Sequence, residues 1–198
     1  MTQTSRQYPR TLENDSVKVE LLPLTADHRE TMLTFARSLP RHDLLFLRRD
    51  LTRESELDGL LADIGRGLVT TLLALEGGKM VGYATLHRSA LHWERHIAEL
   101  RIVVSPENRK RGLGRLLTQE IFALALDRGV EKMMARMTTD QTGAIRTFEG
   151  LGFSPEALLK DHVKDIDGER HDLIVMAHNV AEFDATLSAY GVDASIGS

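Results

Sequence analysis

The stretch of sequence that decides the expected fold is VVSPENRKRGLGR, residues 103–115. The apolar run that leads into it predicts a strand over residues 97–104. After it, Leu113, Leu117 and Ile121 recur at helical spacing, which predicts an amphipathic helix. The short loop between strand and helix contains two glycines, so its backbone N–H groups can converge on an anion at the positive end of the helix.

Four basic side chains add fixed positive charge to this loop, in a chain whose formal net charge is −4. They suit a polyanion such as a pyrophosphate. The loop is not a Walker A motif, because no Gly-Lys-Ser/Thr follows, and it is not a dinucleotide fingerprint, because Leu117 stands where the third glycine of GxGxxG belongs. A phosphate-binding nucleotide enzyme is therefore the weaker alternative. On glycine spacing alone, a plain turn with solvated arginines explains the loop equally well.

A second segment, QTGAIRTFEGLGF at residues 141–153, adds to this reading. The R-x-x-G-x-G pattern of Arg109, Gly112 and Gly114, after a strand that ends in Val-x-Pro, resembles the acetyl-CoA-binding motif of the GNAT family of N-acetyltransferases. The second segment resembles that family's motif N-x-x-A-x-x-x-Y-x-x-x-G-F, and it follows one helix and one strand later. Two motifs at this spacing rarely coincide by chance.

The resemblance covers roughly residues 17–180 and implies a single α/β domain. Its mixed, mostly antiparallel sheet would splay open after the fourth strand and be flanked by about four helices. The pantetheine of acetyl-CoA would lie in the gap and pair with the backbone of Ile102, Val103 and Val104. The rest of the implied cofactor-binding set comprises Arg109, Lys110, Arg111, Gly112, Leu113, Gly114, Arg115, Gln141 and Phe148.

The resemblance also suggests how the chemistry is divided. An attacking amine must lose its proton, and Glu99 on the strand that leads to the loop looks like the glutamate that many members use as a base, directly or through water. The alternative is an exposed charged residue on a strand face. Phe148 stands where the family commonly has a tyrosine acid and cannot donate a proton, so we favour core packing for it. Gln141 replaces an asparagine and keeps the amide.

The histidines and acidic residues are weaker candidates. His87, His92 and His96 surround Trp93, while His162 and His171 belong to a final hairpin. Any of them could serve as a base or proton relay, but a surface or hydrogen-bonded role is the commoner one. We expect no metal site, because charged pairs across the last turn favour a solvated hairpin.

The remaining elements follow from periodicity. We expect strands over 17–22 and 132–137, a helix over 53–64, and a hairpin whose Gly77-Gly78 turn sets Glu76 opposite Lys79. In the last hairpin, a type I′ turn at 167–168 would set Asp165 opposite Arg170 and Val163 opposite Asp172. Residues 1–16 are expected to be a flexible leader, 17–180 the acetyltransferase-like domain and 181–198 a polar tail.

Composition excludes several other classes of protein. The chain has 198 residues and no cysteine, so disulfides, thiolate metal sites and cysteine nucleophiles are ruled out. It has no long apolar run and no secretory signal, which makes the cytoplasm the default location and predicts no membrane partner. The slightly acidic charge argues against nucleic-acid binding.

The leading interpretation is an acetyl-CoA-dependent N-acetyltransferase acting on a primary amine, either a small molecule or a protein amine. Another acyl-CoA as donor, and an acyl-CoA-binding regulatory module with little turnover, are the alternatives. The resemblance would build the acceptor site from the N-terminal helices, residues 46–48 and the hairpin loops. The net charge of −4 is weakly compatible with a cationic acceptor. A homodimer is one option for the assembly state.

Overall fold

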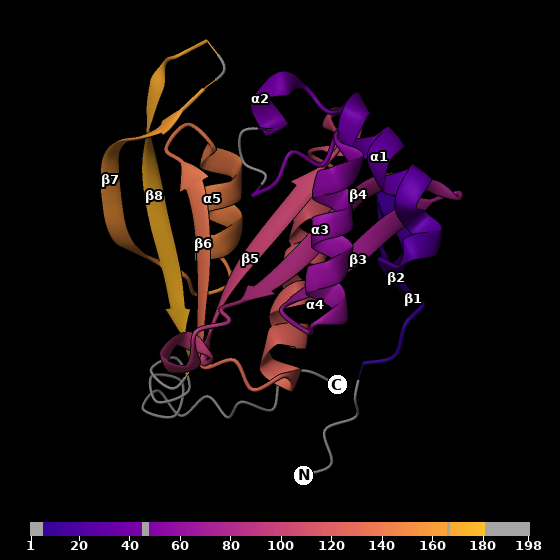
Figure 1. Ribbon diagram of the computed structural model, residues 1–198, viewed down its shortest axis with the longest axis horizontal. Helices are drawn as coiled ribbons and strands as arrows, with labels where there is room; N and C mark the ends of the chain where they lie inside the picture. The colour runs from indigo at the N-terminus through magenta and orange to yellow at the C-terminus, as the bar shows by residue number, and fades with distance from the viewer. Residues whose placement is uncertain (1–5, 45–47, 166, 181–198) are drawn as a thin grey trace.

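The computed structural model describes residues 6–44, 48–165 and 167–180. Its strands form one eight-stranded sheet in the order β1-β2-β3-β4-β5-β6-β8-β7 (Figure 1). The strands are β1 (Arg10–Asn14), β2 (Val17–Pro23), β3 (Val69–Glu76), β4 (Lys79–Arg88), β5 (Ile97–Val104), β6 (Lys132–Thr138), β7 (Ser154–Lys164) and β8 (Arg170–Asn179). The helices are α1 (Arg29–Ser38), α2 (Arg41–Leu44), α3 (Glu54–Gly65), α4 (Leu113–Asp127) and α5 (Thr142–Glu149).

The sheet is mixed, as expected. Strands β5 and β6 run parallel, and every other pair of neighbours in the sheet is antiparallel. Parallel neighbours need a crossover, which α4 supplies between β5 and β6. The expected α/β mixed sheet is therefore confirmed.

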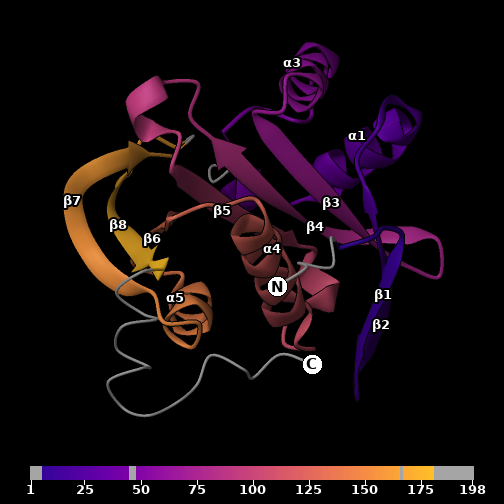
Figure 2. The same ribbon diagram turned by 90° about the horizontal axis from the view of Figure 1, so that it is seen from below.

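Helices cover both faces of the sheet (Figure 2): α1 and α3 lie on one face, and α4 and α5 on the other. Each face has its own apolar core. The predicted stripe of α4 is confirmed, because Leu113, Leu117 and Ile121 are all fully buried in the core on that side. Because strand side chains alternate between faces, Leu100 of β5 joins the α4 core whereas Val103 packs on the α1 and α3 side.

The N-terminal segment differs from the expectation of a flexible leader. Residues 10–14 form β1, which pairs with β2 and places Leu12 opposite Val19. Tyr8 donates a hydrogen bond to the buried Glu120 of α4 at 2.9 Å. The expectation was wrong because β1 has a single apolar residue, Leu12, which packs against the core. The polar residues around Leu12 give the segment no strand pattern in the sequence. The tail expected over 181–198 lies outside the described residues.

The predicted pairing is confirmed in one hairpin and wrong in the other. Glu76 lies opposite Lys79, as predicted. In the last hairpin the predicted register is wrong by one residue, because Lys164 lies opposite Arg170. The carboxylate of Asp165 accepts backbone hydrogen bonds from the loop beyond it, and Asp165 N–H donates to the Glu169 carbonyl at 2.8 Å. These hydrogen bonds to the Asp165 side chain make the loop longer than the two-residue turn that was expected.

Candidate active site

The glycine loop adopts a conformation that few sequences allow. Lys110 and Gly112 have φ angles of 62° and 84°. Gly112 is the residue directly before α4, and a Cβ atom there would lie 2.6 Å from Nδ2 of Asn14. The left-handed backbone therefore favours glycine, and a Cβ atom would also have to displace the Asn14 amide. The loop leads directly into a 15-residue helix, whose first N–H groups have no acceptor within the helix and can bind an anion.

Arg111 anchors this loop from behind. Its guanidinium donates two hydrogen bonds to the Glu76 carboxylate, at 2.9 and 2.7 Å, and another to the Ser16 carbonyl at 2.8 Å. The hydrogen bond from Arg111 holds the pKa of Glu76 below its usual range. Arg111, expected among the cofactor cations, thus has its side chain engaged by β3 and the β1–β2 turn.

The other three basic side chains remain on the outer surface of the loop. Arg109 pairs with Asp43 of α2, and its Nε donates to the Val104 carbonyl at 3.2 Å. Lys110 and Arg115 are exposed, and within the described residues no ion pair occupies them. The loop therefore keeps exposed basic side chains beside the start of α4.

Strands β5 and β6 separate directly next to this loop, as Figure 1 shows. They pair only from Ile97 to Glu99, opposite residues 132–134. Beyond Glu99, no strand of the described chain pairs with the β6-facing edge of residues 102–104. At the corresponding end of β6, Thr138 is 1% exposed and its Oγ1 has no hydrogen-bond partner among the described residues, while its N–H donates to Oε1 of Gln141 at 3.3 Å. A buried hydroxyl without a partner suits a site that a ligand completes.

Glu99 stands on β5 just before the strands separate. It is 9% exposed, so the alternative of an exposed strand residue is wrong. The Arg101 guanidinium contacts its Oε1 at 2.8 and 2.9 Å, Arg48 donates to its Oε2 at 3.3 Å, and Arg136 lies 3.9 Å from the same oxygen. Three guanidinium groups thus surround one carboxylate.

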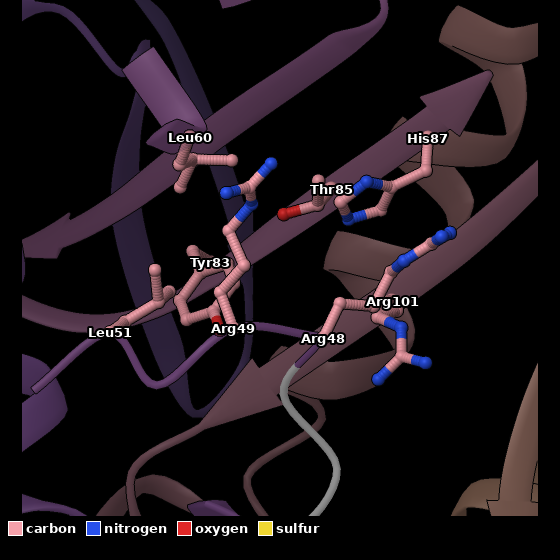
Figure 3. A pocket seen from close by; sticks show the side chains of 8 residues that line it. All are labelled: Arg48, Arg49, Leu51, Leu60, Tyr83, Thr85, His87 and Arg101. Atoms are coloured by element: carbon pink, nitrogen blue, oxygen red, sulfur yellow. The ribbon is translucent and has the colours of Figure 1, made fainter. Parts of the chain in front are cut away.

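A small hollow, partly open to solvent, lies on the α1 and α3 face of the sheet, next to Arg48 and Arg101, which pair with Glu99 (Figure 3). We call it the arginine pocket. Its charged lining is Arg48, Arg49 and Arg101, and its apolar lining is Leu51, Leu60 and Tyr83. Thr85 and His87 of β4 complete it. Of the segment expected in the acceptor site, Arg48 is here, whereas Phe46 and Leu47 lie outside the described residues.

Comparison with known proteins decides the family. The family model described as Acetyltransferase (GNAT) family matches residues 34–153, from α1 to the end of the second motif. This chain belongs to the GNAT family. The curated mycothiol acetyltransferase of Thermobispora bispora is 36% identical over 85 residues, which cover 41% of this GNAT chain and 29% of that protein.

The ribosomal protein bS18-alanine N-acetyltransferase of Escherichia coli is 32% identical over 76 residues, 38% of this chain and 51% of that protein. The matches thus span about half of these curated relatives or less. A solved GNAT structure, a phosphinothricin acetyltransferase from Sinorhizobium meliloti in complex with AcCoA, is 20% identical with a TM-score of 0.70, covering 81% of this chain and 88% of that one. At that identity the likeness supports the fold.

Phe148, in the second GNAT motif, has a structural role. Its ring is 6% exposed and makes an edge contact with Phe153 at a centroid distance of 4.9 Å. Both rings belong to the core on the α4 side. Phe148 therefore packs in the core, in keeping with the interpretation favoured from the sequence.

Two of the candidate histidines, His87 and His171, lie in separate parts of the structure. His87 lines the pocket, and burial followed by the charge of Arg48 lowers its pKa to about 4, so its imidazole is neutral at pH 7. His171 instead pairs with Asp165 at 2.9 Å, and that hydrogen bond raises its pKa. Asp165, Glu169 and His171 form the group of possible metal ligands in the described chain, but both Asp165 oxygens already accept hydrogen bonds.

No described helix has the length and apolar content needed to span a bilayer.

Proposed function

We propose that this chain is an acyl-CoA-dependent N-acyltransferase that transfers acetyl from acetyl-CoA to a primary amine, by direct attack in a ternary complex. The observation that carries the proposal is the separation of β5 from β6 beside the glycine loop, in a chain of the GNAT family. An exposed strand edge and a helix N-terminus lie together there, and they match the two polar parts of an acyl-CoA, its amide-containing arm and its pyrophosphate.

The donor site would be formed by three groups. The β6-facing backbone of residues 102–104 would pair with the pantetheine arm. The N–H groups of residues 112–115, with the side chains of Arg109, Lys110 and Arg115, would hold the pyrophosphate. Arg111 would contribute only its backbone and would fix the loop through Glu76. The unpartnered Thr138 hydroxyl would gain a hydrogen bond from the ligand.

When bound, acetyl-CoA supplies the acyl group as a thioester. A C–N bond forms to the amine and the C–S bond breaks. Glu99 would take the ammonium proton, directly or through water, so that a neutral amine attacks. Phe148 cannot protonate the leaving thiolate, so water or the nitrogen proton of the product would do so. Coenzyme A, whose thiol resembles a cysteine thiol of pKa ~8.5, is a good leaving group, so the reaction does not need a dedicated acid to protonate the thiolate.

Free-thiol release from acetyl-CoA, measured across a panel of primary amines, tests the proposal. We expect release that depends on the amine and saturates with it. Acetyl-CoA binding without amine-dependent release would contradict the enzyme and favour an acyl-CoA-binding regulatory module. Faster release from a longer acyl-CoA would retain the transfer reaction and change the donor.

A further inference from the structure

The β1–β2 turn, residues 14–17, holds the glycine loop at Arg111 from two sides. Asn14 Nδ2 donates a hydrogen bond to the Arg111 carbonyl at 3.2 Å. The Arg111 guanidinium in turn donates to the Ser16 carbonyl at 2.8 and 3.2 Å. A turn far from the loop in the sequence thus contacts both the backbone and the side chain of one loop residue.

Asn14 also fixes the turn itself. Its Oδ1 accepts hydrogen bonds from the N–H groups of Ser16 and Val17, at 2.8 and 2.9 Å. Val17, the last residue of the turn, is 3% exposed and belongs to the core on the α4 side. One side chain therefore closes an anchored turn with its oxygen and holds the loop with its nitrogen.

The contact from Asn14 determines which way a peptide group of the loop faces. In a planar trans peptide, the carbonyl and the N–H that follows it point in opposite directions. Because the Arg111 carbonyl faces Asn14, the N–H of Gly112 faces away from the turn. That N–H has no backbone acceptor among the described residues, and Gly112 directly precedes α4. It is therefore available to an anion at the start of the helix.

We infer that Asn14 is a positioning residue for the pyrophosphate of the acyl-CoA, because it orients the Arg111–Gly112 peptide so that the Gly112 N–H faces the ligand. This inference rests on the proposed function. It gives a role in donor binding to a residue that precedes the part of the chain matched by the family model, residues 34–153. The segment expected from the sequence to be a flexible leader thus contributes to the donor site.

Asn14→Asp separates the two roles of this side chain. A carboxylate oxygen still accepts the two N–H groups of the turn, and Asp is as well suited as Asn to the start of a turn, so the fold is retained. The carboxylate cannot donate to the Arg111 carbonyl. Asn14→Ser removes the same amide donor without added charge and keeps an oxygen that can form a turn.

Lys18→Gln is the control for charge. It makes the net charge more negative by one unit, as Asn14→Asp does, and it lies in the same hairpin. Its side chain loses only an exposed ion pair with Glu13.

Calorimetric titration with coenzyme A measures the effect without turnover. We expect its Kd to rise about three- to tenfold in both Asn14 variants, the scale of one hydrogen bond, and to stay unchanged in Lys18→Gln. In the thiol-release assay, KM for acetyl-CoA should rise by the same factor at an unchanged kcat. S-acetyl-pantetheine, which lacks the pyrophosphate, should keep its kcat/KM.

Wild-type Kd values in both Asn14 variants would overturn the inference. An equal loss with S-acetyl-pantetheine would also overturn it, because the variants would then weaken the whole site. A loss in Asn14→Asp and Lys18→Gln without one in Asn14→Ser would assign the effect to charge and reject the positioning role. Absence of thiol release with every amine would refute the proposed transfer, and the Kd comparison would still decide the role of Asn14. A wild-type protein that does not bind coenzyme A would refute both.

Discussion

His87 of β4 lies directly opposite Glu99 of β5 in the antiparallel ladder, so the imidazole and the carboxylate project from the same face of the sheet. Both belong to the region where β5 is about to separate from β6. One group is an ion-paired carboxylate, and the other is an imidazole that is neutral at pH 7. Two groups that can accept a proton therefore stand next to each other, and their roles can be separated by experiment.

We expect Glu99→Gln to lower kcat by ~10² to 10⁴, the usual range for loss of a general base, with little change in acetyl-CoA affinity. The amide keeps the size of the side chain and its hydrogen bond to Arg101. Initial rates should be measured between pH 6 and 9. Glu30→Gln, at an exposed position of α1, is the control. Wild-type kcat at every pH would exclude Glu99 and make His87 the base to test.

His87 should also make stability depend on pH. Its pKa is about 4 in the folded protein, below the usual 6.5, so the unfolded chain binds more protons between these values and stability falls as the pH drops through that window. Between pH 7.5 and 5 this amounts to about 2 kcal/mol of unfolding free energy. Urea unfolding at the two pH values should show a smaller loss for His87→Gln than for wild type. An identical loss would mean that His87 is already solvated, and exposed His92→Gln should behave like wild type.

Gly112→Ala tests the loop. Gly112 has a φ of 84°, and a Cβ there would have to displace the Asn14 amide, so we expect a loss of about 1–2 kcal/mol of stability and weaker acetyl-CoA binding. Gly78→Ala is a matched control, because Gly78 has a φ of 82° and nothing within 4 Å of its virtual Cβ. It should share the backbone cost and leave binding unchanged. Calorimetric titration of both variants with acetyl-CoA makes the comparison, and equal affinities would remove the loop from the donor site.

Arg111 and Glu76 should behave as one unit. Arg111→Gln and Glu76→Gln are each expected to weaken acetyl-CoA binding a few-fold, because either change releases the loop from β3. The double variant should be no worse than the single ones. Additive losses, or an effect of Arg111→Gln without one of Glu76→Gln, would show that Arg111 contacts the ligand itself.

Local spacing made much of this fold predictable. The loop from Ser105 to Gly112 and the stripe of Leu113, Leu117 and Ile121 are encoded within a few turns of chain, so the strand, the loop and the helix could be assigned from sequence. Strand β1 could not, because its five residues carry a single apolar side chain and depend on β2 for a partner. The register of the last hairpin depends on the Asp165 side chain, which periodicity does not describe.

The arginine pocket was not predictable for a different reason. Arg48 follows α2, and Arg101 lies on β5, 53 positions later in the sequence. They meet only because the sheet and α3 bring the segment after α2 against β5. Net charge averages over such clusters, so it does not describe the charge at one site. His87 was considered with four other histidines, and only the fold separates it from them.

The most direct test of the central claim is the stoichiometry of transfer. The protein is incubated with acetyl-CoA and the primary amine that gives the fastest thiol release in the panel, and free coenzyme A and N-acetylated product are both quantified, the latter by mass. We expect equal amounts of the two, formed only with the amine present and strongly reduced in Glu99→Gln. Bound acetyl-CoA that yields no acetylated amine, or free coenzyme A formed without it, would contradict the account.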